Sequence, residues 1–420
     1  MKFLYGCAWC RRPFAAEGVA YECPRCGSAA PGERARRGWP HGYLAVVWEP
    51  PSRVPFGAPV DPAWFLPLPV PGPAAFPVGN TPLVAAERLR KKAGLPRLYF
   101  KNDTLNPSGS LKDRASLLVA AQAMAAGAPS VALASTGNAG ASMACAGAAL
   151  GLEVILFVPA AAPRAKLLQS LVYGARVVPV DGTYDDAYAL SIEYTTARGG
   201  VNRNTAYNPF TIEGKKTVSL EIYNQLGAAV PDVVYVPTGD GVILSGVVKG
   251  FGDLRKSGAS DRSPVPVAVQ ATGSNAIARG WREGHETCLE GTNTIADSLS
   301  VSRPAAGLMA QMCLRRYGGR AVEVSDREIR AAQAELAKDA GLFVEPSSAA
   351  AWAGLLADRE AGSRIEARDT VVVLLTGTGF KDMKAAEALV TLPRPCRADL
   401  ESALRLLRDV YGMKAAARGR

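Results

Sequence analysis

The sequence predicts an α/β fold built on mostly parallel sheets with helices on both faces. Short apolar runs recur along the chain, and each leads into glycine, serine or threonine and then into a stretch with helical spacing. Continuous apolar strands that alternate with helices are typical of parallel sheets covered on both faces. With 420 residues, the chain is long enough for two or three domains. The expected strands are LYFKND (98–103), VALAST (131–136), EVILFVP (153–159), RVVPVDG (176–182), DVVYVPTGDG (232–241), PVAVQATG (266–273) and DTVVVLLTGTG (369–379).

Composition and charge narrow the class of protein. The net charge of +10 suits an anionic cofactor or substrate. The basic residues are scattered and form no stripe with interleaved aromatic residues, so we expect no nucleic-acid partner. The start, MKFLYGCAWC, lacks the long apolar core of a secretory signal, and the apolar region 130–162 is interrupted by Asn138, glycines and Glu153. We therefore expect a cytoplasmic protein that does not enter a membrane.

Four of the eight cysteines form two C-x-x-C pairs, Cys7 with Cys10 and Cys23 with Cys26, with twelve residues between the pairs. Each pair places two thiolates on one side of a tight turn, and two such turns complete a tetrahedral zinc site. The alternative is a set of redox-active or incidental cysteines. With all four metal positions filled by protein, the zinc would be structural, and the folding of a zinc-ribbon-like segment over 1–40 would depend on it.

Four turns that follow predicted strands carry the polar groups of a candidate site. They supply a lysine, a hydroxyl and amide cluster, a glycine-rich loop and a second hydroxyl, at the sheet edge where ligands collect. This set suits pyridoxal phosphate, because a lysine can bond its aldehyde, a helix N-terminus can face its phosphate and polar side chains can fix its ring. The turns are NPSGSLKDR (106–114), STGNAGAS (135–142), PTGDGVILSG (237–246) and LLTGTGFKD (374–382).

The lysine of the first turn is Lys112. It follows Ser110 and Leu111 and precedes Asp113, so it lacks the glycine spacing of a phosphate-binding P-loop. The remaining alternatives are an exposed lysine at the start of a helix and a covalent anchor for a cofactor.

The order of these turns along the chain and their residues resemble those of the fold-type II pyridoxal-phosphate enzymes, and specifically those of the threonine synthase group. The resemblance runs from Gly79 in GNTPL to about Ala386 and includes NPFTIEGKKT (208–217), LFVEPSSAA (342–350) and TGTGFKD (376–382). It implies a tryptophan synthase beta-like fold with two parallel-sheet domains, and some relatives also carry an N-terminal cysteine ribbon. The expected domains are the zinc-ribbon-like segment (1–40), a proline-rich linker that wraps the body (41–80), a large cofactor-binding domain (81–114 and 200–395), a small domain (115–199), and a C-terminal helix with a basic tail (396–420).

The resemblance implies a role for each polar residue of the turns. Lys112 would form the Schiff base with pyridoxal phosphate and, once released, would move the α-proton; desolvation would lower its pKa toward neutrality. Asn138 would hydrogen-bond the 3-hydroxyl of the cofactor. Hydroxyls and backbone amides of Ser135, Thr136 and Gly137 would bind the substrate carboxylate.

Thr376 matches the position that meets the pyridine nitrogen of the cofactor. A neutral hydroxyl there would favour elimination and replacement at Cβ or Cγ over transamination. The simpler interpretation is that Thr376 caps the next helix.

Gly239, Asp240, Gly241 and Val242 match the loop whose amides bind the cofactor phosphate. The family usually has asparagine in place of Asp240 and glycine in place of Val242. Because a carboxylate close to a phosphate dianion is repulsive, we expect Asp240 to point outward.

The segment expected to bind the substrate also departs from the family. Threonine synthases bind the phosphate of O-phosphohomoserine partly through asparagine, serine and arginine in the segment matching TAYNPFT (205–211), where this chain has Thr205, Ala206 and Thr211. Ala139 stands where relatives often have threonine. The candidates to replace the lost donors are Arg203, Lys215 and Lys216.

We therefore expect a pyridoxal-phosphate-dependent lyase of the threonine synthase type, with a small amino-acid substrate and structural zinc. The alternative is a paralogue with another substrate, such as a serine or threonine deaminase, or a β-replacement enzyme acting on O-phosphoserine. A catalytically idle binding protein is a third class, against which the intact Lys112, Asn138 and Thr376 argue. Analogy with the fold suggests a homodimer.

Overall fold

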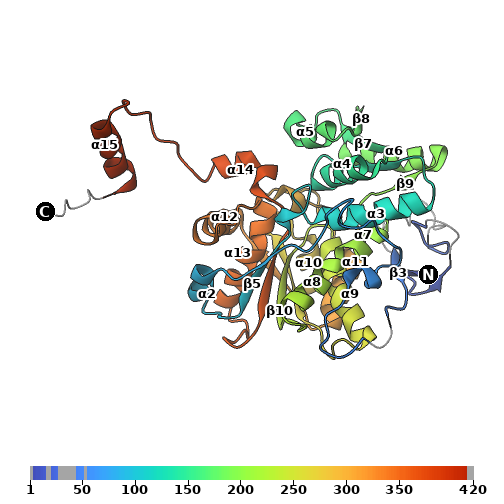
Figure 1. Cartoon of the computed structure of the whole chain (residues 1–420). Coiled ribbons are helices and arrows are strands. Elements are labelled where there is room, and N and C mark those ends of the chain that lie inside the picture. The colour runs from blue at the N-terminus through green and yellow to red at the C-terminus, as the bar shows by residue number, and fades with distance from the viewer. Residues whose placement is uncertain (1–2, 16–19, 27–43, 52–53, 414–420) are drawn as a thin grey trace. The chain divides into compact units, whose positions relative to one another are not determined.

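The elements of the chain are shown in Figure 1, which is drawn from a computed structural model. Two compact units form, Met1–Asp382 and Met383–Arg420. Two expected segments lie at least partly outside the described residues. These are the basic tail at 414–420 and, at 27–43, the end of the expected ribbon and the start of the expected linker. The structure describes residues 3–15, 20–26, 44–51 and 54–413.

The larger sheet of the first unit has six strands in the described part of the chain. They run parallel except for the edge strand β4, which pairs antiparallel with β5. Strand β13, the last in the sequence, lies in the middle of the sheet between β10 and β5. In spatial order the strands are β12 (Arg320–Val324), β11 (Val265–Ala271), β10 (Val233–Pro237), β13 (Val371–Leu375), β5 (Leu98–Asn102) and β4 (Leu83–Val84).

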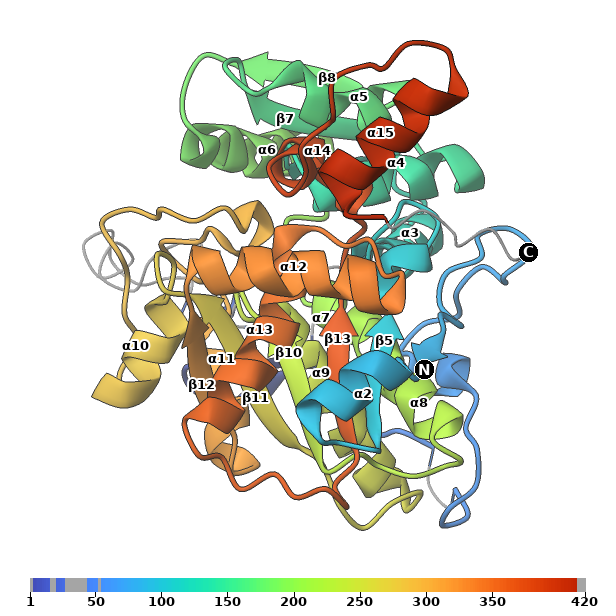
Figure 2. The ribbon, with the colours of Figure 1, turned by 90° about the vertical axis from the view of Figure 1, so that its left-hand side faces the viewer.

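Helices cover both faces of this sheet. Alternate residues of β10 point to opposite faces, so that Val233 and Tyr235 belong to one core cluster while Val234 and Val236 belong to another. Helix α13 packs across the first face, with α12 and α2 beside it (Figure 2). The helices of this face are α2 (Glu87–Ala93), α12 (Asp326–Ala340) and α13 (Pro346–Glu360), and those of the other are α8 (Thr217–Gln225), α9 (Val242–Ser257), α10 (Ala276–Glu283) and α11 (Gly307–Arg316).

The smaller sheet is parallel throughout its four described strands. Helices α3 and α4 cover one face and α6 covers the other, while α5 packs on α4. In spatial order its strands are β8 (Arg176–Val180), β7 (Val154–Pro159), β6 (Val131–Ala134) and β9 (Val201–Asn202). Its helices are α3 (Lys112–Ala125), α4 (Asn138–Leu150), α5 (Arg164–Val172) and α6 (Tyr184–Arg198).

All seven predicted strands are present, as β5, β6, β7, β8, β10, β11 and β13. The expectation of mostly parallel sheets with helices on both faces is confirmed. Three further strands of these two sheets were not predicted: the two-residue strands β4 and β9, and the half-buried strand β12.

The N-terminal segment forms a small antiparallel sheet of β1 (Leu4–Cys7), β2 (Pro13–Phe14) and β3 (Leu44–Val47). Strand β3 belongs to the stretch expected to be a linker, and Lys249 of α9 donates a hydrogen bond to its Val46 carbonyl at 2.8 Å. The stretch continues along the body, where Val60 exchanges backbone hydrogen bonds with the Asn224 side chain of α8.

The remaining described elements are short or belong to the second unit. No helix among the described residues is long and apolar enough to cross a membrane. The short elements are η1 (Pro62–Phe65), η2 (Asp103–Leu105), α7 (Phe210–Lys215), η3 (Asp297–Leu299) and η4 (Gly379–Lys381), and the second unit contains α14 (Met383–Glu387) and α15 (Leu400–Tyr411).

Candidate active site

Lys112 is the first residue of α3, next to the carboxyl end of β13. The backbone N–H of Leu111 donates to the Thr376 carbonyl at 2.8 Å, which ties the start of α3 to the end of that strand. The preceding loop needs Gly109, because its φ is +87° and a Cβ there would lie 2.9 Å from the Thr378 side chain. The loop therefore fixes where Lys112 emerges.

Residues from all four predicted turns line one small cavity. From the sequence-predicted set, these are Lys112, Asn138, Gly239, Asp240 and Thr376. Gly241 and Val242 follow directly and begin α9, with Gly241 in the left-handed conformation at a φ of +89°. The lining residues that sequence reasoning did not assign to the site include Ser298, Glu345 and Ser347.

A second, more open cavity of about 480 Å³ adjoins the first. Asn138, Ser298, Glu345 and Ser347 line both cavities. The predicted residues Thr136 and Gly137 line the more open one.

The third predicted residue of that turn, Ser135, has a local role. Its hydroxyl oxygen accepts hydrogen bonds from the backbone N–H groups of Gly137 at 3.2 Å and Gly140 at 3.1 Å. These bonds shape the turn that leads into α4.

Burial lowers the pKa of the Lys112 amine below its ordinary value. The carboxylates of Asp240 and Glu345 oppose that effect, and the guanidinium of Arg203 adds to it. The net result is an amine that loses its proton more readily than an exposed lysine does.

Glu345 holds Asn138, and sequence reasoning assigned it no role. Both carboxylate oxygens accept hydrogen bonds from Asn138 Nδ2 at 3.0 Å. Burial raises the pKa of Glu345 to about 7, although the contact with Asn138 opposes this. Gly377 makes room for the carboxylate, because a Cβ there would lie 2.4 Å from Glu345 Oε1. The only sequence signal was its place in the quoted motif LFVEPSSAA, just before a helix-starting proline.

The expectation that Asp240 points outward is wrong. Asp240 lines the same cavity as Lys112, and its Oδ1 accepts a hydrogen bond from the Val242 backbone N–H at 3.0 Å. The start of α9 attracts this carboxylate, because backbone N–H groups at a helix N-terminus are unsatisfied and carry partial positive charge.

The interpretation of Thr376 as a helix cap is also wrong. The helical turn that follows, η4, has Thr378 at its N-cap position. Thr376 is buried, lines the cavity, and lies 3.2 Å from the hydroxyl of Ser348, which also accepts its backbone N–H at 3.0 Å. Its hydroxyl is thus oriented by α13 beside the cavity.

The three candidate cations near the substrate segment differ in their contacts. Lys216 is paired with Glu213 and Asp253, at 2.7 Å each, and so is occupied. Arg203 is fully buried and donates through Nη1 to Thr205 Oγ1 at 2.7 Å. Among the described residues, Arg203 Nη2 and Lys215 Nζ have no hydrogen-bond partner.

Burial lowers the pKa of both unpaired cations. The pKa of Arg203 falls to about 10, and that of Lys215 falls well below its ordinary value with a contribution from the charge of Lys112. Asp240 opposes both shifts, so it acts as a partial counter-charge for the two cations.

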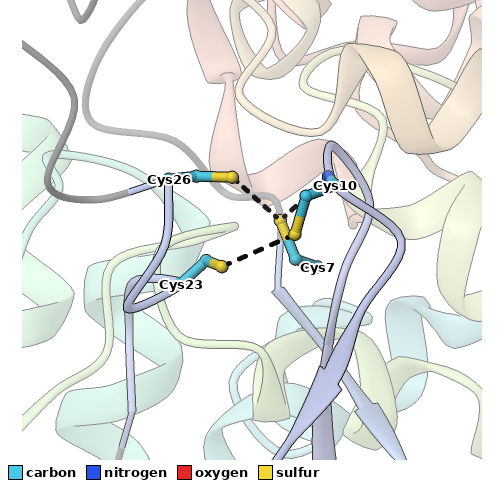
Figure 3. A group of neighbouring side chains, drawn as sticks. All are labelled: Cys7, Cys10, Cys23 and Cys26. Carbon is cyan, nitrogen blue, oxygen red and sulfur yellow. Dashed lines mark hydrogen bonds between the residues drawn. The ribbon is translucent and has the colours of Figure 1, made fainter.

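The four predicted cysteine ligands come together in the N-terminal segment (Figure 3). Their sulfur atoms all lie within 4.8 Å of one another. Cys7 Sγ lies 3.9 Å from Cys26 Sγ, and Cys10 Sγ lies 3.8 Å from Cys23 Sγ.

Comparisons with known proteins agree with this geometry. A family model described as pyridoxal-phosphate dependent enzyme matches residues 74–377. The threonine synthase of Methanosarcina acetivorans is 35% identical over 335 residues, which cover 79% of this chain and 82% of the relative. That of Synechocystis sp. is 36% identical over 310 residues, which cover 73% of this chain and 78% of the relative.

Solved structures share the fold. Maize serine racemase superposes with a TM-score of 0.65 at 24% identity, covering 73% of this chain and 90% of the racemase. The processed form of threonine deaminase isoform 2 from Solanum lycopersicum gives 0.65 at 22% identity, covering 81% and 97%.

The chain belongs to the family of pyridoxal-phosphate dependent enzymes and has the α/β core of fold type II. Within that family its relatives identify it as a lyase of the threonine synthase type.

Proposed function

We propose that the chain converts O-phosphohomoserine and water to threonine and phosphate, by elimination at Cγ and addition of water at Cβ. The observation that carries the proposal is the convergence of Lys112, Asn138 and Thr376 on one cavity, in a chain 35% identical to a threonine synthase.

The donor set around the cavity fits pyridoxal phosphate. Lys112 would hold its aldehyde, Asn138 its ring hydroxyl and Thr376 its ring nitrogen. The backbone amides of Gly239, Asp240 and Gly241, directly before the sixteen-residue helix α9, would hold its phosphate, whereas the Val242 N–H donates to Asp240 Oδ1. When bound, the cofactor withdraws electrons from the α-carbon of the substrate and so makes the α-proton acidic.

Lys112 is proposed to move that proton. A lysine whose pKa is lowered by burial is neutral closer to physiological pH and can then act as a base. Glu345 is proposed to keep the Asn138 amide oriented toward the cavity, since both carboxylate oxygens of Glu345 accept hydrogen bonds from the amide nitrogen.

The substrate carboxylate is proposed to bind the turn at the N-terminus of α4. Thr136 and Gly137 line the more open cavity and would offer a hydroxyl and backbone N–H groups. Ser135 would act with them by holding the shape of the turn.

The substrate phosphate needs positive charge in place of the missing arginine. Arg203 and Lys215 are proposed to supply it, because both are buried cations with an unpaired nitrogen. They would also offset the charge of Asp240 beside the cofactor phosphate.

A second candidate function is that of a paralogue acting on another amino acid, by deamination of serine or threonine or by β-replacement on O-phosphoserine. It is favoured by Thr205, Ala206 and Thr211, which stand at the positions matching the family's phosphate-binding asparagine, serine and arginine, so that the serine and arginine donors are absent. A charge-assisted hydrogen bond contributes about 1.5–3 kcal/mol, so the loss of the arginine weakens phosphate binding unless other cations replace it.

A substrate screen separates the two candidates. Purified enzyme is incubated with O-phosphohomoserine, O-phosphoserine, serine and threonine, and phosphate, ammonia and amino-acid products are measured. Phosphate release with threonine formation from O-phosphohomoserine supports the first function. Ammonia from serine or threonine, or phosphate from O-phosphoserine alone, supports the second.

We also propose that the four cysteines hold a structural Zn²⁺. A tetrahedral site with Zn–S bonds of about 2.3 Å has S–S edges of about 3.8 Å, and two edges here are 3.9 and 3.8 Å. Elemental analysis should find one zinc ion per chain, and Cys23→Ser together with Cys26→Ser should remove it. A protein purified without chelators and free of zinc would contradict the proposal.

A further inference from the structure

Tyr21 joins the N-terminal segment to the body of the enzyme. It lies two residues before Cys23. Its hydroxyl oxygen accepts a hydrogen bond from the Asn202 backbone N–H at 2.7 Å. Its ring stacks on Tyr207, with centroids 4.7 Å apart and 12° between the planes. One side chain therefore contacts both ends of the turn 202–207.

The turn that Tyr21 contacts has a strained backbone. Ala206 has a φ of +69° and is fully buried. A residue other than glycine in this conformation costs about 1–3 kcal/mol and keeps it only where the surroundings hold it. The Tyr21 ring, stacked on the next residue, Tyr207, helps to keep Ala206 in this conformation.

The same turn supports the catalytic region. Asn204 Oδ1 accepts a hydrogen bond from the Ala134 backbone N–H at 2.7 Å, directly before the turn at the start of α4. Arg203 belongs to the turn as well, and its side chain donates to Thr205 within it. A shift of the turn 202–207 would therefore move Asn204, which supports the turn proposed to bind the substrate carboxylate. It would also move Arg203, a cation whose charge acts on Lys112.

We propose that Tyr21 is a positioning residue. Through its contacts, an ordered backbone at the cysteine site would stabilise the conformation of the turn 202–207 and, with it, the substrate-binding side of the active site. Metal bound by Cys23 and Cys26 would fix the backbone that follows Tyr21, and loss of the metal would release it. The kinetic part of this inference rests on the proposed function, whereas the structural part does not.

Hydrogen exchange tests the structural part in the holoenzyme. We expect the amides of residues 201–207 to exchange about tenfold faster in Tyr21→Ala, since a hydrogen bond and a ring stack are lost, and about threefold faster in Tyr21→Phe, which keeps the stack. The matched control is Tyr223→Phe, because the Tyr223 hydroxyl donates to the Ala58 and Ala259 carbonyls, outside both the N-terminal segment and the turn. Unchanged exchange in both Tyr21 variants would overturn the inference.

Metal removal tests the route. Chelation should speed exchange at 201–207 in the wild-type protein and add little in Tyr21→Ala, where the connection is already broken. An equal effect of chelation in both proteins would show that the metal acts by another path and would overturn the inference.

Steady-state kinetics test the effect on the substrate. With O-phosphohomoserine, Tyr21→Ala should raise KM about tenfold and leave kcat within about threefold, with cofactor absorbance unchanged, because ground-state binding is weakened and Lys112 is untouched. Tyr223→Phe should leave KM unchanged, and an equal rise in KM in that control would overturn a specific role for Tyr21. A wild-type enzyme that does not turn over O-phosphohomoserine would instead contradict the proposed function, and the exchange experiments would still decide the positioning role.

Discussion

Two buried charged clusters lie next to each other along helix α3, and they are built in opposite ways. In the first, Arg114 donates to Asp103 at 2.6 and 2.8 Å and to Glu221 at 2.6 and 2.8 Å. Lys101 adds a contact to Glu221 at 2.6 Å. Burial alone would raise the pKa of Glu221, but its cationic partners lower it to about 2.

The second cluster surrounds Lys112, two residues earlier in the chain. Here Lys215 Nζ and Arg203 Nη2 have no hydrogen-bond partner among the described residues, and burial lowers the pKa of all three cations. Asp240 is a carboxylate that attracts all three.

The comparison distinguishes the charges around Arg114, which stabilise the fold, from the charges around Lys112, which are proposed to act in the active site. A paired buried ion is strongly stabilised by its partner, and breaking the pair leaves an uncompensated charge. An underpaired buried cation costs stability, and such strongly perturbed groups are enriched at functional sites. Substitutions in the two clusters should therefore differ in sign as well as in size.

The largest expected effect is on catalysis at Lys112. Lys112→Ala should lower turnover by at least about a thousandfold, because it removes the proposed base and the anchor of the cofactor. Stability toward denaturant should change little, since the removed amine is underpaired. Turnover assays and unfolding curves measure both, and a variant with full activity would remove the mechanism.

The largest expected effect on stability is at Arg114. Arg114→Met should lower the free energy of unfolding by about 3–5 kcal/mol, because Asp103 and Glu221 lose their buried partner. The matched control is Arg88→Met, whose side chain is 72% exposed and pairs with Asp339. The control should change stability by less than about 1 kcal/mol. Denaturant unfolding checks both, and equal losses would contradict the distinction.

A smaller, pH-dependent effect is expected at Glu345. Its pKa rises from 4.5 to about 7 on folding, so between these values the folded protein keeps a proton that the unfolded chain releases. Its contribution to stability therefore falls as the pH rises through this window. Glu345→Gln keeps an acceptor for Asn138 without the charge, and should be more stable than wild type by about 3 kcal/mol at pH 8 and by less than about 1 kcal/mol at pH 5. Thermal unfolding at the two pH values measures this, and the same difference at both would argue against titration of Glu345.

The smallest expected effect has the opposite sign to that at Arg114. Lys215→Met should leave the free energy of unfolding unchanged or raise it by about 1 kcal/mol, because an apolar side chain of similar length replaces an unpaired buried cation. Unfolding curves under the conditions used for Arg114→Met give the direct comparison. A loss as large as that of Arg114→Met would show that Lys215 is a paired, structural charge.

The sequence predicted those parts of the fold that have a local signal. Strands such as β10 and β13 are continuous apolar runs rich in valine, and their turns are marked by glycine and threonine. Strands β4 and β9 have two residues each, and β12 carries charged residues at a sheet edge. Such strands form because a longer neighbour offers hydrogen bonds, which no short window of sequence reveals.

The site shows the same division. Lys112, Asn138 and Thr376 were singled out because they lie in polar turns at the ends of predicted strands and match motifs of the resembled family. Glu345 was missed because it follows a segment that enters the site through one isolated bridge, between Val344 and Thr378. The inward position of Asp240 depends on a helix terminus and on buried cations far away in the sequence.

The place of β13 has a consequence for synthesis of the protein. This strand fills the gap between β10 and β5, yet it is translated after both. Until it leaves the ribosome, β5 and β10 each present a row of unpaired backbone groups, which other chains can bind. Between the synthesis of β10 and that of β13, the nascent chain thus carries two unpaired strand edges and an unfinished catalytic pocket, a situation that favours protection by chaperones.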